Sequence, residues 1–177
     1  MTIGLRLFKR LCDFLFVLAV VSLFWLLIII WIAVRLSSPG PGFLWQARVG
    51  RNEMIFHCLK FRTMKAGTAS IGTHLMSPAA ITPIGRFLRA TKLDELPQAW
   101  NIVAGEMTLV GPRPCLPNQV ELIAARRELG AFDAAPGITG WAQVHGIDMS
   151  DPNRLAMWDN SYLDGNSVGM ECRIMFM

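Results

Sequence analysis

The longest uninterrupted apolar pattern lies close to the start of the chain. From Phe14 to Val34 no residue is charged, and Ser22 is the only polar one. As a helix these 21 residues would be roughly 31 Å long, about the thickness of the hydrocarbon core of a bilayer. The pattern predicts a membrane-anchoring helix within residues 1–36. A cleaved signal peptide fits less well, because the run is too long and no small-residue cleavage site follows it.

Basic residues stand on both sides of this segment, so its topology stays open. They are Arg6, Lys9 and Arg10 before it, and Arg35, Arg48 and Arg51 after it. A spanning helix would place one basic set outside, whereas a re-entrant helix would keep both sets on the cytoplasmic side. Asp13 lies directly before the apolar run. We expect it either to pair with Lys9, four residues back on the same helix face, or to be a solvated helix-end carboxylate.

Residues 37–42, Ser-Ser-Pro-Gly-Pro-Gly, end the helix and mark the boundary of a second domain, residues 37–177. Two runs, 42–50 and 54–64, then predict short strands joined by a turn, which together make a β-hairpin. Lys60 and Arg62 are two residues apart and would share one face of the second strand. They form either a solvent-facing pair or part of a binding site.

The pattern changes after the hairpin. Residues 65–80 are rich in Ala, Gly, Ser and Thr and show no apolar period, which predicts a loop able to close over a ligand. The next segment has apolar residues at helical spacing, at Ile84, Phe87 and Leu88. A helix of this kind leaves Arg89 available for binding.

The adjacent carboxyl groups of Asp94 and Glu95 are the first candidates for chemistry. Pro97 has no N–H and is tolerated only in the first turn of a helix, so a helix running towards Val103 must begin near Asp94. The positive end of that helix would lower the pKa of both carboxyl groups and keep them ionised. Asp94 either caps the helix, or the two acids form a catalytic pair in which one attacks phosphorus and the other holds Mg²⁺.

Phosphate chemistry needs cations near these carboxylates, and Arg113 is the strongest candidate. Pro112 and Pro114 restrict the backbone on both sides of it, so its guanidinium is held on a stiff loop. The planar fork of donors suits phosphate oxygens. A structural arginine that bonds nearby carbonyl groups is the alternative. Further on, residues 136–146 are punctuated by glycine, so that their backbone can approach a ligand closely.

Composition narrows the class of protein. The chain is 53% hydrophobic and only 17% charged, with a mean hydropathy of +0.38, which is oily for a soluble domain of 177 residues. Its net charge of +4 suits anionic headgroups or phosphorylated ligands but is too dispersed for nucleic-acid binding. The four cysteines lie far apart in the sequence, which predicts free thiols in a reducing compartment rather than a metal cluster or a disulfide framework.

Several motifs occur in the order found in bacterial sugar transferases. They are Lys9-Arg10-x-x-Asp13, Ser38-Pro39-Gly40-Pro41, Gln46-x-Arg48-x-Gly50, Lys60-Phe61-Arg62-Thr63-Met64, Leu93-Asp94-Glu95-Leu96-Pro97-Gln98, Gly111-Pro112-Arg113-Pro114 and Pro136-Gly137-Ile138-Thr139-Gly140. Over about residues 9–162 the chain resembles this family, and in particular its small monotopic phosphoglycosyl transferases, which begin glycan assembly on a polyprenol carrier.

The resemblance implies an α+β, mostly helical fold, with a re-entrant membrane helix, a short β-hairpin and amphipathic helices at the cytoplasmic face of the bacterial inner membrane. It implies that Asp94 attacks the β-phosphate of a UDP-sugar, that UMP leaves, and that polyprenol (undecaprenyl) phosphate then accepts the phosphosugar. Glu95 would hold the Mg²⁺ cofactor. The residues expected to bind substrate are Arg113, Lys60, Arg62, Arg89, Pro112 and Pro114. Membrane lipid is the other expected partner.

The chain departs from the family pattern in three ways. Trp25 and Leu26 stand where a central Ser-Pro breaks the membrane helix of relatives, and His145 stands where Asn is usual. The chain stops at Met177, short of a C-terminal helix that many relatives carry, so its last residues either lie against the membrane surface or form a truncated element. The rival function is a membrane-tethered binding protein without turnover, and the intact pair of carboxyl groups argues against it.

Overall fold

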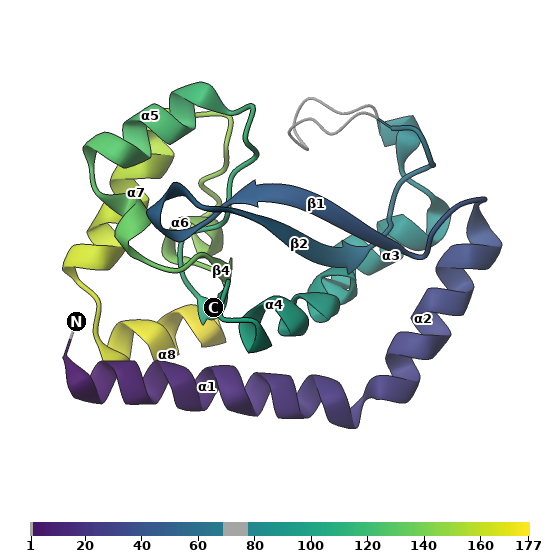
Figure 1. Ribbon diagram of the computed structural model, residues 1–177, viewed down its shortest axis with the longest axis horizontal. Coiled ribbons are helices and arrows are strands. Elements are labelled where there is room, and N and C mark those ends of the chain that lie inside the picture. The colour runs from purple at the N-terminus through teal and green to yellow at the C-terminus, as the bar shows by residue number, and fades with distance from the viewer. Residues whose placement is uncertain (1, 69–77) are drawn as a thin grey trace.

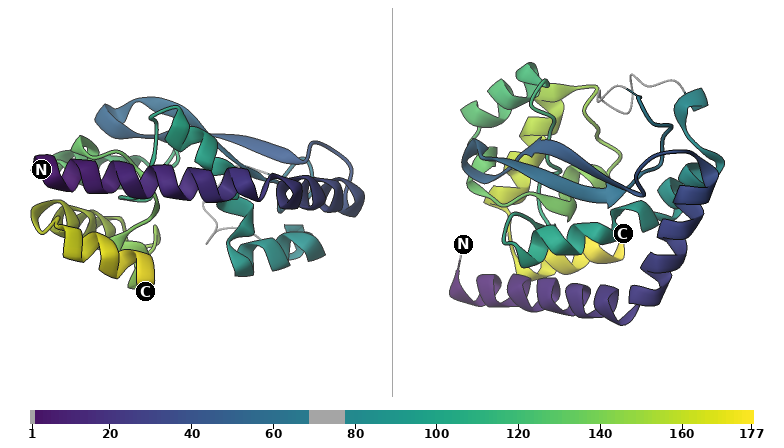
Figure 2. Two further views of the ribbon diagram at one scale, coloured as in Figure 1. Left: turned by 90° about the horizontal axis from the view of Figure 1, so that it is seen from below. Right: turned by 45° about the vertical axis from the view of Figure 1, so that its right-hand side comes forward.

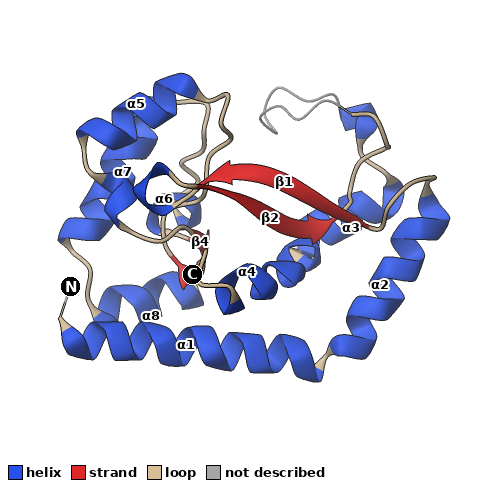
Figure 3. Ribbon diagram, in the orientation of Figure 1, coloured by secondary structure: helices blue, strands red, loops and turns tan. Residues whose placement is uncertain are grey.

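The computed structural model describes residues 2–68 and 78–177. It has an α+β fold in which helices predominate and a two-stranded hairpin crosses the middle of the molecule (Figure 1 and Figure 3). The loop expected at 65–80 falls largely outside the described residues. Where its ends are described, the Lys65 N–H donates to the Ala80 carbonyl at 2.9 Å, and Pro78–Ala80 forms a 3₁₀ turn, η3.

The apolar segment forms two helices rather than one. α1 (Ile3–Ser22) and α2 (Phe24–Ser37) meet at Leu23 with a bend of 65°. The Ser22 hydroxyl donates to the Ala19 carbonyl at 2.8 Å, and the Leu23 N–H also donates to it, at 3.2 Å. Such competition for one carbonyl bends a helix. Within the described residues no single helix has the length and apolar character to cross a membrane, but the bent pair together does.

The bent pair has one face packed on the protein and one exposed apolar face. The bent pair runs along one side of the molecule, and α1 lies beside the last helix, α8 (Val168–Phe176) (Figure 1 and Figure 2). The exposed apolar residues of α1 are Ile3, Leu7, Leu11, Phe14, Leu15, Leu18 and Val21. Those of α2 are Phe24, Trp25, Ile28, Ile29, Trp31, Ile32 and Leu36. Exposed apolar surface of this extent marks a binding surface for lipid or another protein.

The predicted hairpin is confirmed. β1 (Phe43–Val49) and β2 (Ile55–Phe61) pair antiparallel along their whole length. The connecting turn is η1 (Arg51–Glu53), in which Asn52 adopts a left-handed φ of 54°. Asparagine tolerates this conformation better than most residues, which explains its place in the turn. The second strand ends before Arg62, so Lys60 and Arg62 do not continue along one strand face.

The hairpin contributes to three of the four apolar clusters of the described residues. In the first cluster, Val49 packs with Cys115, Leu122 and Leu155. In the second, Phe61 packs with Ile30, Val34 and Leu88. In the third, Phe56 and Cys58 pack with Phe16, Ile102 and Met107. The first arm of the bent pair is therefore anchored by one cluster and the second arm by another. This separate packing holds the bend in place.

Short elements complete the fold around the hairpin. In chain order they are α3 (Pro83–Thr91), η4 (Leu93–Gln98), α4 (Ala99–Val103), β3 (Thr108–Val110), α5 (Val120–Glu128), η5 (Ala131–Asp133), β4 (Gly137–Thr139), α6 (Trp141–Val144) and α7 (Pro152–Asp164). α5 and α7 lie at one end of the hairpin and α3 at the other (Figure 1). β3 and β4 pair in parallel. The helix expected around Ile84 and Leu88 is confirmed as α3.

Buried polar contacts attach α1 to the C-terminal half. Lys9 Nζ donates to Glu171 Oε1 at 3.0 Å, to the Tyr162 hydroxyl at 2.7 Å and to the Val110 carbonyl at 2.7 Å. Glu171 lies on α8, so the end of the chain is a helix packed against α1. The sequence had left the structure of this segment open.

Asp13 differs from both of its expected states. Its carboxylate is only 5% exposed and accepts hydrogen bonds from the Thr108 hydroxyl at 2.8 Å and the Leu109 N–H at 2.7 Å. It is therefore not a solvated helix-end group. The expected pair with Lys9 is also wrong, because the ammonium group of Lys9 is bound to Glu171. Asp13 instead joins α1 to β3.

Candidate functional site

The two candidate carboxyl groups lie side by side at the start of η4. α3 ends at Thr91. Lys92, which follows it, adopts a left-handed φ of 59°, and η4 begins immediately after Lys92. Asp94 and Glu95 occupy the first turn of this 3₁₀ helix, with Pro97 inside it and α4 following. The predicted helix start near Asp94 is thus confirmed. The residue that precedes η4 is Lys92 and no side chain caps it, so Asp94 does not act as the cap.

A buried amide holds this helical segment against the hairpin. Asn101, on α4, is 0% exposed; its Oδ1 accepts from the Leu59 N–H at 3.0 Å and its Nδ2 donates to the His57 carbonyl at 2.8 Å. Both backbone groups belong to β2. Asn101 therefore positions the carboxyl groups relative to the strand, a role that no pattern in the sequence indicated.

Glu95 is paired with the arginine expected to bind phosphate. Arg113 Nη2 lies 2.5 Å from Glu95 Oε1, and Glu95 is 7% exposed. Burial alone would raise the pKa of Glu95, but the charge and hydrogen bond of Arg113 outweigh it and hold that pKa below its usual value. Glu95 is therefore ionised at neutral pH, as expected.

Asp94 has a different environment, although it is equally buried. Burial raises the pKa of Asp94, and the neighbouring charge of Glu95 raises it further, while Lys60 and Arg89 act in the opposite direction. The expectation that the helix end would lower the pKa of both acids is therefore wrong for Asp94. The cause is desolvation together with the second carboxylate, which the position in a helix does not reveal.

A glutamine on β1 gathers two cations beside the carboxyl groups. Gln46 Oε1 accepts from Lys60 Nζ and from Arg48 Nη2, each at 2.8 Å. Arg48 Nη1 donates to the Pro114 carbonyl at 2.9 Å, which connects the hairpin to the Arg113 loop. Burial, and next the charge of Arg48, lower the pKa of Lys60 to about 8. Sequence reasoning placed Lys60 among the binding residues, whereas Gln46 and Arg48 stood in a motif and were given no binding role.

Close backbone packing fixes the loop that carries Arg113. The Gly111 N–H donates to the Thr139 carbonyl, and the Gly137 N–H donates to the Pro112 carbonyl, both at 2.9 Å. A Cβ atom on Gly137 would lie 2.1 Å from the Gly111 nitrogen, so only glycine fits there. The glycine-punctuated segment thus approaches the arginine loop itself.

Comparison with known proteins decides the family. The family model described as "Bacterial sugar transferase" matches residues 5–177. The chain belongs to the bacterial sugar transferase family. This confirms the resemblance drawn from the motifs.

Curated members of the family resemble the chain along most of its length. It is 33% identical to "Undecaprenyl-phosphate glucose phosphotransferase" of Komagataeibacter xylinus, over 91% of the chain and 33% of that protein. It is 36% identical to "UDP-glucose:undecaprenyl-phosphate glucose-1-phosphate transferase" of Xanthomonas campestris, over 91% of the chain and 35% of that protein. It is 34% identical to "Exopolysaccharide production protein ExoY" of Sinorhizobium fredii, over 95% of the chain and 82% of that protein. The chain spans about a third of the length of the first two.

The other basic residues expected at the candidate site differ in position. Arg89 donates through Nε to the Thr63 hydroxyl at 2.8 Å, and its charge acts on Asp94. Arg62 is 6% exposed, and its guanidinium donates to the backbone carbonyls of Ser38, at 2.7 Å, and Pro39. The structure therefore brings Arg89 towards the carboxyl pair, whereas Arg62 holds the turn that follows α2.

The carboxyl pair suits a metal ion only in combination with substrate. Among residues 2–68 and 78–177, no group of three His, Cys, Asp or Glu side chains could hold a metal. Mg²⁺ commonly binds through one or two carboxylates together with substrate phosphates and water. Asp94 and Glu95 offer such a set. The donors fit an ion shared with a diphosphate rather than a closed protein site.

A cavity of about 280 Å³ is lined by Arg113, the arginine that bonds to Glu95. Its other polar lining residues include Gln143 and Asp148, neither of which was singled out in the sequence. Behind it the His145 ring packs between Trp141 and Trp158, with ring centroids 4.1 and 4.8 Å away. Histidine at this family position therefore serves aromatic packing.

Proposed function

We propose that this chain transfers a sugar 1-phosphate from a UDP-sugar to polyprenol (undecaprenyl) phosphate, with release of UMP, and so initiates glycan assembly. The observation that carries the proposal is the buried pair of Asp94 and Glu95, with Arg113 on Glu95 and further cations around Asp94. The names of two relatives describe transfer to undecaprenyl phosphate and so support this reaction class.

In the first step, a carboxylate oxygen of Asp94 attacks the β-phosphorus of the donor. A bond forms between that oxygen and phosphorus, the bond from phosphorus to the bridging oxygen breaks, and UMP leaves with its electron pair. Asp94 must be ionised to attack. Lys60 and Arg89 favour the ionised form, and the pair of neighbouring cations also attracts the diphosphate.

In the second step, a phosphate oxygen of the polyprenol phosphate attacks the same phosphorus. The aspartyl–phosphorus bond breaks, and the carboxylate of Asp94 is regenerated. Arg113 binds phosphate oxygens through the part of its guanidinium that Glu95 does not occupy, with Pro112 and Pro114 keeping its loop stiff. Glu95 would hold Mg²⁺, which neutralises the diphosphate and stabilises the leaving UMP.

The proposed location is the cytoplasmic face of the bacterial inner membrane, with residues 1–36 as the anchor and 37–177 as the catalytic domain. The exposed apolar face of the bent pair would lie in lipid. A bend of 65° allows both basic flanks to remain on one side, which favours the re-entrant arrangement. A spanning arrangement would place one of the basic flanks on the far side of the membrane.

The reaction is tested by measuring UMP release from a panel of UDP-sugars, in detergent with Mg²⁺ and polyprenol phosphate. We expect a radiolabelled phosphosugar to remain on the wild-type protein when acceptor is withheld, and none on Asp94→Asn. Label on Asp94→Asn would overturn the assignment of the nucleophile. A wild-type protein that binds donor but releases no UMP would support the binding-protein alternative. Chelation with EDTA should abolish release if the metal is required.

The topology is tested by thiol labelling in intact cells. A variant without its four native cysteines carries a single new cysteine through Thr2→Cys. The re-entrant arrangement predicts no reaction with a membrane-impermeant reagent until the cells are opened. Labelling from outside would contradict it.

A further inference from the structure

We propose that the cavity beside Arg113 binds the nucleoside of the donor, and that Gln143 selects uracil by accepting a hydrogen bond from its N3–H. This inference rests on the proposed function, because it assigns the base-recognising part of the same donor site. It adds a residue and an atom that the motifs of the family do not single out.

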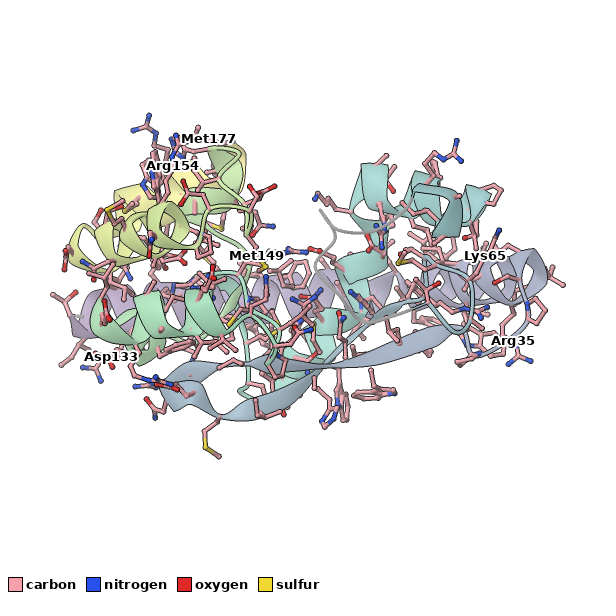
Figure 4. The ribbon with its side chains drawn as sticks, turned by 90° about the horizontal axis from the view of Figure 1, so that it is seen from above. Arg35, Lys65, Asp133, Met149, Arg154 and Met177 are labelled. Carbon is pink, nitrogen blue, oxygen red and sulfur yellow. The ribbon has the colours of Figure 1, made fainter. Side chains whose placement is uncertain are left out.

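The position and size of the cavity suit one part of a nucleotide sugar. Arg113 lines it, and the same guanidinium lies 2.5 Å from Glu95, so this one arginine connects the cavity with the carboxyl pair. Its volume of about 280 Å³ is near the lower limit of the roughly 300–1,000 Å³ typical of small-molecule sites. Met149, which also lines it, lies near the middle of the molecule (Figure 4).

The lining combines the kinds of group that a nucleoside requires. Ile147, Met149 and Leu155 supply apolar walls for the faces of a flat ring. The Asp148 carboxylate, which accepts from the Ser150 N–H at 2.9 Å, is the kind of group that binds ribose hydroxyls in nucleotide sites. Arg113, which also lines the cavity, would receive the phosphates that follow the ribose.

Gln143 carries an acceptor that the other described residues leave unused. Its Nε2 donates to the Ile138 carbonyl at 3.2 Å, which fixes the orientation of the amide group. Its Oε1 is buried and has no hydrogen-bond partner in the described part of the chain. A buried acceptor without a donor is costly and rare in native proteins, so a ligand donor is the natural partner.

Uracil offers the matching group. Its N3 carries a hydrogen, whereas N3 of cytosine is an acceptor that Gln143 Oε1 would repel. Because Oε1 is shielded before ligand binds, the base must displace a neighbouring side chain to reach it. Met149 lines the same cavity, and its unbranched side chain moves at little cost.

The test compares a UDP-sugar with its N3-methyl analogue, which lacks the N3–H. We expect the wild-type protein to show a KM about 10- to 100-fold higher for the analogue, as expected for loss of one buried hydrogen bond. Gln143→Ala removes the acceptor and makes room for the methyl group, so both donors should then have KM values within about threefold of each other. The ratio of the two KM values reports recognition of the base, which a purely structural role of Gln143 would leave unchanged.

Gln119→Ala is the matched control, because this glutamine lies outside the cavity and bonds to the Leu116 N–H. It should keep the discrimination of the wild-type protein. Equal KM values of the wild-type protein for the UDP-sugar and its N3-methyl analogue would overturn the inference, and so would a Gln143→Ala variant that distinguishes the two donors as strongly as the wild-type protein does. The wild-type measurement can overturn the inference even if the variant does not fold. Absence of UMP release from every UDP-sugar would instead refute the proposed function.

Discussion

Two buried ionic centres of this chain differ in how their charges are balanced. Arg126 and Asp159 are each 2% exposed, and the guanidinium donates twice to one carboxylate oxygen, at 2.9 and 2.6 Å. One cation meets one anion, and the centre is complete. At the candidate site Glu95 has Arg113, but Asp94 forms no ion pair with any described residue. Burial raises the pKa of both Asp94 and Asp159, but only Asp159 has an arginine bonded to it. The candidate site becomes complete only when an anionic ligand joins its cations.

The largest effect should come from Asp94→Asn. Transfer should fall by at least about 10³-fold, because a nucleophile is removed.

The unfolding temperature of Asp94→Asn at pH 7 should rise, because a raised pKa means that the ionised carboxylate destabilises the fold above that pKa. The gain should shrink as the pH falls and the wild-type Asp94 gains its proton. Thermal unfolding in EDTA at several pH values checks this; lower stability at pH 7 would contradict it.

Asp159→Asn should do the reverse and unfold the protein more easily. It leaves the Arg126 guanidinium as a buried charge without its partner, which typically costs about 3–5 kcal/mol. Urea unfolding in detergent measures the loss. A double variant, Arg126→Met with Asp159→Leu, should recover most of it, because no charge then remains buried. If Asp159→Asn were as stable as the wild-type protein, the contrast between the two centres would fail.

A smaller effect should appear in the pH profile of donor binding. Lys60 has a pKa of about 8, so the KM for the UDP-sugar should rise above pH 8 as this cation is lost, by roughly tenfold for each pH unit. Lys60→Arg keeps its charge and should remove that rise. Lys65→Arg, at an exposed lysine of the described chain, is the control and should leave the rise in place. A profile unaffected by Lys60→Arg would remove Lys60 from the site.

The smallest effect is expected at an exposed ion pair. Arg127 Nη2 lies 2.6 Å from Glu53 Oε2, but the arginine side chain is 61% exposed. Water screens such a pair, so Glu53→Gln should leave the urea midpoint unchanged within error. A shift comparable to that of Asp159→Asn would show that short distance, rather than burial, sets the contribution of ion pairs here.

Local patterns predicted the hairpin, α3 and the start of the helix that carries the carboxyl pair. Each depends on neighbours in sequence: alternation with a turn, apolar spacing, and a proline confined to a first turn. The partners of Asp13 and Lys9 could not be found in this way. Their contacts lie 95 and 162 residues away along the chain, so only the tertiary fold brings them together.

The candidate site shows the same division. Motif and chemistry singled out the acids, Arg113 and Lys60, whereas the hydrogen bonds of Gln46 and Gln143 could not be predicted from the sequence. The pKa of Asp94 was predicted with the wrong sign, because desolvation depends on what covers a side chain rather than on its place in a helix. The bend at Leu23 occurs without the expected Ser-Pro, because a serine hydroxyl and the separate packing of the two arms produce it.

The hairpin has a consequence for how the protein opens. A strand pair that belongs to three clusters cannot leave one of them without disturbing the other two, so local unfolding around it is costly. The amide hydrogens of β2 should then exchange with solvent only when the whole domain unfolds. Gln46, Arg48 and Lys60 share that rigidity, so the cationic side of the site is ordered before any ligand arrives and loses little entropy on binding.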